Sequence, residues 1–318
     1  MIYERRPLAN CKPIFSFRAE LFSYEEVIRV FVLTLVGGIS LGCLYALSAL
    51  GLVLIFRTSN VVNFAQGEMA MFCAFIAYTV LRQWHLSYLA AVIVALAFAF
   101  LLGVFVEMVF MRKVQHANLL SQIILTLALY MIFRGVAGII WGFTPTSFPT
   151  ALSTDPIHIG SAVVTQDSLF IYAVTIFLLI IFYWIIRYTK LGLAMRVVSQ
   201  NIVISRLMGI RVRSIMASTW GIATVLGAIA GVLIAPQTML SPTMMAEVAI
   251  MGFAAAVVGG FSSLPGAVVG GLIIGIAENM FGSYVSQSFQ TVFIFLLIII
   301  VMYLRPNGLF GKHTIKKV

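Results

Sequence analysis

Long apolar stretches restrict what this chain can fold into more than any other feature of its sequence. A helix needs about 20 mostly apolar residues to cross the hydrocarbon layer of a bilayer, and the chain contains about nine stretches of this kind. Only 9% of its 318 residues are charged, whereas a soluble domain carries about a quarter. We therefore predict an all-α polytopic membrane protein with about eight or nine transmembrane helices.

The positions of the charged residues predict which side of the membrane each loop faces. The formal net charge of +10 does not indicate a nucleic-acid partner, because the basic residues gather at ends of spans that alternate as cytoplasmic. Residues 187–213 contain six basic residues and no acid, whereas residues 142–167 contain no Lys or Arg. The first loop is predicted to be cytoplasmic and the second external. Nine crossings with a cytoplasmic C-terminus place the N-terminus outside, but the basic residues near the N-terminus favour the inside, so its side stays open.

The chain divides into three parts. Residues 1–28 are a mixed-charge lead-in or tail, residues 29–311 are a single transmembrane domain, and residues 312–318 are a basic C-terminal tail. A cleavable signal is not predicted, because the first apolar run begins too late and is too long. The three cysteines and four histidines are scattered, so neither a disulfide framework nor a metal site is predicted.

The cytoplasmic loop 187–213 has the pattern of a basic amphipathic helix. Apolar residues recur in it at roughly helical spacing, Gly192 precedes the expected start, and Gly209 can end it in a left-handed conformation. This pattern allows two interpretations. The helix either lies on lipid headgroups and retains the loop at the membrane, or it is a docking surface for a soluble partner that moves the transmembrane part.

The segment 57–71 interrupts the apolar pattern of the first half. Asn63, Gln66 and Glu68 lie in it, and only thirteen apolar residues, Met69 to Leu81, follow before Arg82. A helix that crosses the membrane here must begin near Val61, which places the three polar side chains in the bilayer. Irregular polar backbone at that depth needs protein or water around it, and a carboxylate there is a candidate functional group.

A charge on Glu68 in the membrane needs a partner. Arg134 is the only basic residue deep inside an apolar run, which makes it the ion-pair candidate. The alternatives are hydrogen bonds from Asn63 and Gln66, or from the N–H groups at the start of the second helix, where the helix dipole favours a negative charge. Glu107, in contrast, lies beside Arg112 at a cytoplasmic end, and we expect a structural ion pair there.

The second half contains a matching interruption. A Gly-rich run is interrupted by a break at 259–265, which includes Ser262 and Ser263. Glu278 lies near the end of the helix after this break. Two broken helices in corresponding halves are the best sequence-level indication of a substrate pathway in a transporter. The predicted pathway residues are Asn63, Gln66, Glu68, Arg134, Ser262, Ser263 and Glu278. The two stretches share no convincing identity, so an internal repeat is only a hypothesis.

Four motifs together resemble one known family. SLGCLYALSALGLVLIFRTSNVVNFAQGE (40–68), the Arg196 to Gln200 segment followed by RLMGI (206–210), AAAVVGGFSSLPGAVVGGLIIGIAE (254–278) and YLRPNGLFG (303–311) are similar to motifs of permease subunits of branched-chain amino acid ABC importers. The resemblance covers residues 37–311. It implies that loop 187–213 docks on an ATPase subunit, with Arg196, Gln200, Arg206, Leu207 and Gly209 as the contacting residues.

The resemblance also implies the partners. They are ATP-binding cassette ATPase subunits, a second homologous permease subunit and a periplasmic substrate-binding protein, assembled in the bacterial inner membrane. This chain has no nucleotide-binding loop, since its single Gly-Lys pair, Gly311-Lys312, is followed by His. We therefore expect it to bind no cofactor and to leave ATP hydrolysis to its partners.

Two departures from the family pattern bear on the substrate. Gln66 stands where relatives usually have His, and Ser262 where Gly is common. The resemblance therefore implies that the solute is a branched-chain amino acid or a related small molecule such as an amide, urea or an aromatic acid. An ion-coupled secondary transporter that uses Glu68, Arg134, Glu247 and Glu278 is the alternative. An enzyme is not indicated, because no nucleophile–base pair or acidic cluster is present.

Overall fold

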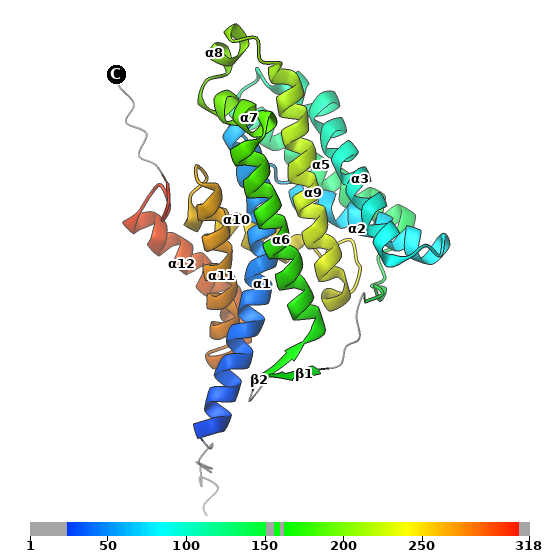
Figure 1. The fold of residues 1–318 in the computed structure, drawn as a ribbon, viewed down its shortest axis with the longest axis vertical. Coiled ribbons are helices and arrows are strands. Elements are labelled where there is room, and N and C mark those ends of the chain that lie inside the picture. The colour runs from blue at the N-terminus through cyan, green and yellow to red at the C-terminus, as the bar shows by residue number, and fades with distance from the viewer. Residues whose placement is uncertain (1–23, 151–155, 160–161, 312–318) are drawn as a thin grey trace, which may run out of the picture.

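The protein is a bundle of helices of unequal length (Figure 1). The computed structural model describes residues 24–150, 156–159 and 162–311. The predicted lead-in and basic tail fall mostly outside these ranges, although the first helix already begins at Tyr24. The helices are α1 (Tyr24–Ser59), α2 (Gln66–Gln83), α3 (Tyr88–Val106), the π-helix η1 (Glu107–Met111), α4 (Arg112–Val114), α5 (Leu119–Trp141), α6 (Gln166–Tyr188), α7 (Lys190–Gln200), α8 (Ile202–Leu207), α9 (Val212–Thr238), α10 (Ala246–Gly259), α11 (Leu264–Tyr284), the 3₁₀-helix η2 (Gln287–Phe289) and α12 (Gln290–Leu304).

The length and apolar character of the helices confirm the prediction of an all-α polytopic membrane protein. Within the described ranges, seven helices are long and apolar enough to cross a membrane, and α10 is a shorter apolar helix. With α2, they account for the nine predicted stretches. The only strands in the described residues form a small hairpin, in which β1 (Pro156–Ile159) pairs antiparallel with β2 (Ala162–Thr165). This hairpin lies in the predicted external loop, at the end of the bundle opposite α8 (Figure 1).

The two halves of the chain repeat the same order of elements. A long helix (α1 or α9) is followed by a short connection, a shorter helix (α2 or α10) and two further helices (α3 and α5, or α11 and α12). The halves interlock, because α1 packs on α11 and α10 while α9 packs on α3 and α2. The end of α1 and the start of α9 lie at the same end of the bundle, near α7, so the halves run in opposite directions (Figure 1). This arrangement supports the hypothesis of an internal repeat.

Glycines set the closest helix contacts. A Cβ added at Gly42 would lie 2.9 Å from the Cα of Leu272 on α11, and one at Gly103 on α3 would lie 2.5 Å from the carbonyl oxygen of Trp220 on α9. Lipid removes the hydrophobic drive for association between helices, so close backbone contact supplies the stabilisation. The predicted tight packing of the first span through Gly38 and Gly42 is therefore confirmed, and its partner is α11.

Two local features complete the end of the bundle that carries α7 and α8. Arg112 binds Glu107 through Nη2 and Oε2 at 2.6 Å, which confirms the predicted structural pair. The closing segment folds back onto the turn between α10 and α11, where the N–H groups of Leu309 and Phe310 donate to the carbonyls of Val258 and Gly259. The break predicted at 259–265 is this turn.

Candidate functional site

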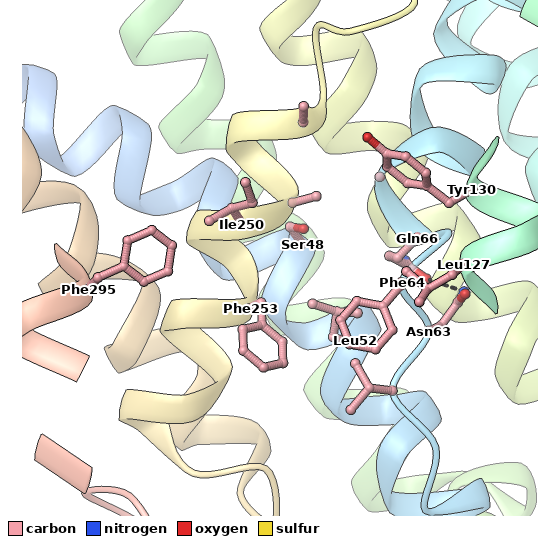
Figure 2. Close-up of a pocket in the computed structure, with 14 residues that line it drawn as sticks. Ser48, Leu52, Asn63, Phe64, Gln66, Leu127, Tyr130, Ile250, Phe253 and Phe295 are labelled. Carbon is pink, nitrogen blue, oxygen red and sulfur yellow. Dashed lines mark hydrogen bonds between the residues drawn. The ribbon is translucent and has the colours of Figure 1, made fainter. Parts of the chain in front are cut away.

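A cavity of about 300 Å³ lies between α1, α2, α5, α10 and α12. Figure 2 shows that its walls are mainly aromatic and aliphatic side chains, with a few polar groups among them. The polar groups come from Ser48, Asn63, Gln66 and Tyr130, and the apolar walls include Leu52, Phe64, Leu127, Ile250, Phe253 and Phe295. A small solute with an apolar portion and a few hydrogen-bonding groups suits this lining.

The N-terminal ends of α2 and α10 meet beside this cavity. A Cβ added at Gly67 would lie 2.7 Å from the Cβ of Ala249, so a residue with a side chain at this position would push the two helices apart. The first N–H groups of a helix lack intrahelical partners and carry the positive end of its dipole. Two such ends therefore converge on one cavity, which is the arrangement that broken helices give to transporter binding sites.

The start of α2 is fixed by a chain of amide hydrogen bonds. Asn63 Oδ1 accepts from the N–H of Ala65 at 3.1 Å, and Asn63 Nδ2 donates to Gln66 Oε1 at 3.3 Å. Gln66 Nε2 in turn donates to the carbonyl of Ala223, near the middle of α9, at 2.7 Å. This contact places the start of α2 halfway along a membrane-spanning helix, as the sequence predicts for these residues.

Glycines make room for the Gln66 side chain. A Cβ added at Gly51 would lie 2.6 Å from Gln66 Nε2, and one at Gly227 would lie 2.9 Å from the same atom. Gln66 is therefore held between α1 and α9 by its shape as well as by its hydrogen bonds. The two amides hold the connection between α1 and α2 in place. None of these hydrogen bonds involves Glu68.

Glu68 lies in the first turn of α2 and is only 1% exposed. Its carboxylate interacts with the hydroxyl of Tyr130 on α5 and is attracted by Arg134. Arg134 Nη1 donates to the same Tyr130 hydroxyl at 3.0 Å. The candidate ion pair between Glu68 and Arg134 is not a direct contact among the described residues, and Tyr130 interacts with both side chains instead. Glu68 Oε2 has no hydrogen-bond partner there.

Tyr130 is the residue that sequence reasoning missed. It lines the cavity and also contacts the side chains of Glu68 and Arg134, so it connects these two residues to the cavity wall. It lies four residues before Arg134, which puts both on one face of α5. This spacing is the sequence feature from which Tyr130 could have been predicted as a neighbour of Arg134.

Of the seven predicted pathway residues, only Asn63 and Gln66 line this cavity. Glu68 and Arg134 lie behind its wall, next to Tyr130. The other three lie on other parts of the fold. Ser262 and Ser263 are in the turn between α10 and α11, where Ser263 Oγ caps α11 by accepting from the N–H of Gly266 at 3.0 Å. Glu278 is buried on α11 and hydrogen-bonds with Tyr45 on α1.

In the second half, the cavity is lined by Ala246, Ala249, Ile250 and Phe253 of α10, which follows the irregular segment 239–245. As in the first half, a long helix is followed by a connection and a shorter helix, and an acidic residue, here Glu247, lies in the first turn of the shorter helix.

The loop 187–213, which is predicted to be cytoplasmic, forms two helices instead of the single predicted helix. Asn201 ends α7 and caps α8, because its side chain accepts from the N–H groups of Val203 and Ile204. Gly209 has φ +75°, which confirms the expected left-handed ending. Gly192 lies inside α7 and packs against the end of α6, so it does not precede the helix as expected.

The predicted docking residues separate into two groups. Arg206 and Leu207 belong to α8, which lies at the tip of the bundle opposite the β1–β2 hairpin (Figure 1), and Leu207 is 82% exposed. Gln200 and Gly209 are also exposed. Arg196 faces inward, since its Nε is buried and its Nη2 donates to the carbonyl of Arg187 at 3.4 Å. Arg196 therefore does not belong to the exposed surface of α8.

Comparison with known proteins identifies relatives over almost the whole chain. The permease protein LivH of a high-affinity branched-chain amino acid transport system in Escherichia coli K12 is 28% identical, over 92% of this chain and 100% of that protein. The corresponding permease BraD of Pseudomonas aeruginosa is 29% identical, over 89% of this chain and 97% of that protein. A probable branched-chain amino acid permease LivH of Methanocaldococcus jannaschii is 30% identical, over 86% of this chain and 91% of that protein.

The family match agrees with the architecture. Residues 34–302 match the family described as the permease component of branched-chain amino acid transport systems. This range runs from the first span to the last and includes both short helices. The chain is thus a multi-pass membrane protein of the transport machinery and not an enzyme, and it belongs to the branched-chain amino acid transport permease family.

Proposed function

We propose that this chain forms the solute pathway of an ATP-driven importer in the bacterial inner membrane. The observation that carries this proposal is the cavity of about 300 Å³ at which the N-terminal ends of α2 and α10 converge. A solute that reaches this cavity leaves water and meets preformed hydrogen-bonding groups at mid-bundle. The membrane segments contribute no nucleotide-binding loop, so ATP is hydrolysed by partner subunits and this chain needs no cofactor of its own.

The proposed solute is a branched-chain amino acid or a related small molecule. Leu52, Phe64 and Phe253 offer an apolar wall to an aliphatic side chain. The two helix starts favour the carboxylate of an amino acid, while Ser48 and Tyr130 supply hydroxyl groups. Amides, urea and aromatic acids are the related solutes to be compared with it. A periplasmic binding protein delivers the solute in this proposal.

A second permease subunit is proposed to cover the open side of the cavity. Four of the apolar side chains in its wall are also exposed on the surface of this chain, namely Phe64, Leu127, Ile250 and Phe295. A homologous subunit placed against this surface would close the cavity and complete the pathway. The exposed side chains would then be buried between two protein chains.

The ATPase is proposed to dock on α8. Its apolar side chains Val203, Ile204 and Leu207, followed by Met208, are exposed, and the helix lies at the tip of the bundle (Figure 1). A helix that served only to retain the loop at the membrane would turn such side chains toward lipid next to the spans. Docking on a soluble partner instead gives these side chains a protein surface to bury against. The C-terminus lies on the same, cytoplasmic side in this proposal.

Transport by the reconstituted complex tests the function. Proteoliposomes that contain this chain, the second permease and the ATPase should accumulate leucine only with ATP and the binding protein, and uptake should persist after an ionophore collapses the proton gradient. Urea and an aromatic acid, assayed in parallel, define the solute class. Uptake that follows the ion gradient without ATP would instead identify an ion-coupled transporter.

Two substitutions with matched surface exposure test the docking helix. Arg206→Glu on α8 should reduce co-purification of the ATPase and solute-stimulated hydrolysis by about tenfold, because it reverses charge on the docking surface. Lys190→Glu, an equal charge reversal at the start of α7, should leave both near wild type. Equal effects of the two substitutions, at equal membrane abundance, would return the loop to a retention role.

A further inference from the structure

A second large groove lies on the face of α1 that α6 and α11 flank. Its volume is about 470 Å³, and its apolar wall includes Leu179, Phe182 and Ile186 of α6 and Val268 and Val269 of α11. Side chains of α6 around it, such as Ile180 and Tyr183, are exposed. Figure 1 shows α6 and α11 on either side of α1. The cavity proposed for the solute has different walls, so the two sites are distinct.

Three arginines stand at one end of this groove. Arg57 is in the last turn of α1, Arg187 is in the last turn of α6, and Arg196 is on α7. All three lie toward the end of the bundle that carries α7 and α8. The groove therefore joins a long apolar wall to a cationic end at the predicted cytoplasmic surface.

The three arginines lack acidic partners. Among the described residues, no Asp or Glu lies within ion-pairing distance of any of them, since the single ion pair found there is Arg112–Glu107. Arg57 and Arg196 are close enough to repel each other, and the buried Nε of Arg196 has no hydrogen-bond partner in the described chain. A partly buried cluster of like charges is costly unless an anion neutralises it.

The shape of the groove determines what kind of anion fits. An inorganic anion or a nucleotide would contact the arginines but leave the apolar wall unfilled. A molecule with a negatively charged headgroup and a long hydrocarbon chain contacts both parts. Basic sites between membrane helices at the cytoplasmic side have the chemistry that binds acidic lipid headgroups.

We propose that this groove binds an anionic phospholipid of the cytoplasmic leaflet. Its phosphate lies among Arg57, Arg187 and Arg196, and an acyl chain runs along the wall formed by α6 and α11. Because Arg196 belongs to α7, and α7 leads directly into α8, the lipid holds the base of the docking segment against the membrane. The proposal is independent of which solute the protein carries.

The full-length protein can test this by native mass spectrometry in detergent. The probes are phosphatidylglycerol and phosphatidylcholine with identical acyl chains. Wild type should retain phosphatidylglycerol in preference to phosphatidylcholine. The double substitution Arg57→Gln/Arg196→Gln should reduce this preference by about tenfold or more, because each basic residue contributes to binding of acidic lipid. The control Lys190→Gln/Arg213→Gln removes the same charge elsewhere on the cytoplasmic side and should keep the preference.

A third variant tests the apolar part of the groove separately. Val269→Trp fills the groove while all three arginines stay, and it should reduce retention of phosphatidylglycerol by several fold without changing the thermal unfolding temperature in detergent. Equal retention of the two lipids by wild type would overturn the proposal, as would equal losses in the arginine and control variants. Displacement of the lipid by inorganic phosphate alone would also overturn it, because it would reveal a simple anion site.

Discussion

At the scale of single residues, Glu68 and its surroundings define the chemistry of the membrane interior. A carboxylate at mid-membrane costs about 2.5 kcal/mol or more on an isolated helix. Here the cost is reduced by three features together, namely the first turn of α2, the Tyr130 hydroxyl and the attraction of Arg134. The Glu68 carboxyl group therefore belongs to a small network between α2 and α5.

We expect Glu68→Gln to insert and assemble but to lose transport, because the amide keeps the volume of the side chain and removes its charge. Glu107→Gln is the matched control, since Glu107 is equally buried but pairs with Arg112 away from the cavity. Uptake in membranes with equal protein abundance is the measurement. Wild-type uptake by Glu68→Gln would show that the carboxylate has no part in the pathway.

Tyr130→Phe tests the network without removing a charge. The substitution removes the hydroxyl that lies between Glu68 and Arg134. A hydrogen bond to a charged group contributes about 1.5–3 kcal/mol, so we expect transport to fall by about tenfold or more. Phe133→Leu, an apolar change on the same helix, should retain most of the activity. A normal rate in Tyr130→Phe would mean that the two charges do not need this bridge.

The sequence allowed the position of Glu68 to be predicted but not its partner. A polar residue in an apolar stretch is conspicuous, and the short run after it fixed where the helix begins. Tyr130 is not conspicuous, because tyrosines occur on many faces of membrane helices. Which face of α5 turns toward α2 depends on packing, which the local sequence does not encode.

At the scale of elements, close contact between glycines holds the long helices together. Gly275 of α11 lies directly against the backbone of Gly42 on α1, so that an added Cβ would overlap it. Gly135 of α5 has no atom within 4 Å of such a Cβ. Replacing each of these glycines by alanine therefore separates the effect of helix packing on stability from the effect of helix propensity.

We expect Gly275→Ala to destabilise the protein by about 2–3 kcal/mol, because α1 and α11 must move apart. Gly135→Ala should be neutral or stabilising by up to about 1 kcal/mol, since alanine is the better helix former. Thermal unfolding and folded yield in detergent measure both. Equal stability of the two variants would show that the α1–α11 contact is looser than the backbone indicates.

The sequence predicts some of the breaks between helices but not all of them. The connection after α1 and the turn at 259–265 stood out through their polar and glycine residues. The split between α7 and α8 depends on one capping side chain, Asn201, inside an amphipathic pattern that continues across it.

At the scale of the whole molecule, hydrophobicity predicts the spans but not their arrangement. Both α9 and α12 are strongly apolar, yet most of α9 is buried whereas Ile294 is the one buried residue of α12. In lipid the surface of the protein is as apolar as its interior. The interlocking of the two halves, with α1 on α11 and α9 on α3, therefore had to come from the structure.

The orientation of the molecule, in contrast, follows from charge and can be measured. In a background with Cys11→Ser, Ser147→Cys in the loop before β1 should react with a membrane-impermeant maleimide in intact cells. Val203→Cys on α8 should react only after the membrane is opened. The native Cys43 and Cys73 are buried and should contribute little labelling. Positions 147 and 203 should differ in labelling because residues 187–213 carry six basic residues while residues 142–167 carry none.

Ser283→Cys at the end of α11 is the second external position, because the opposed halves place it at the hairpin end of the bundle (Figure 1). Labelling of positions 147 and 203 from the same side would contradict the opposed arrangement of the halves. Labelling of 147 and 283 from outside and of 203 from inside would support it.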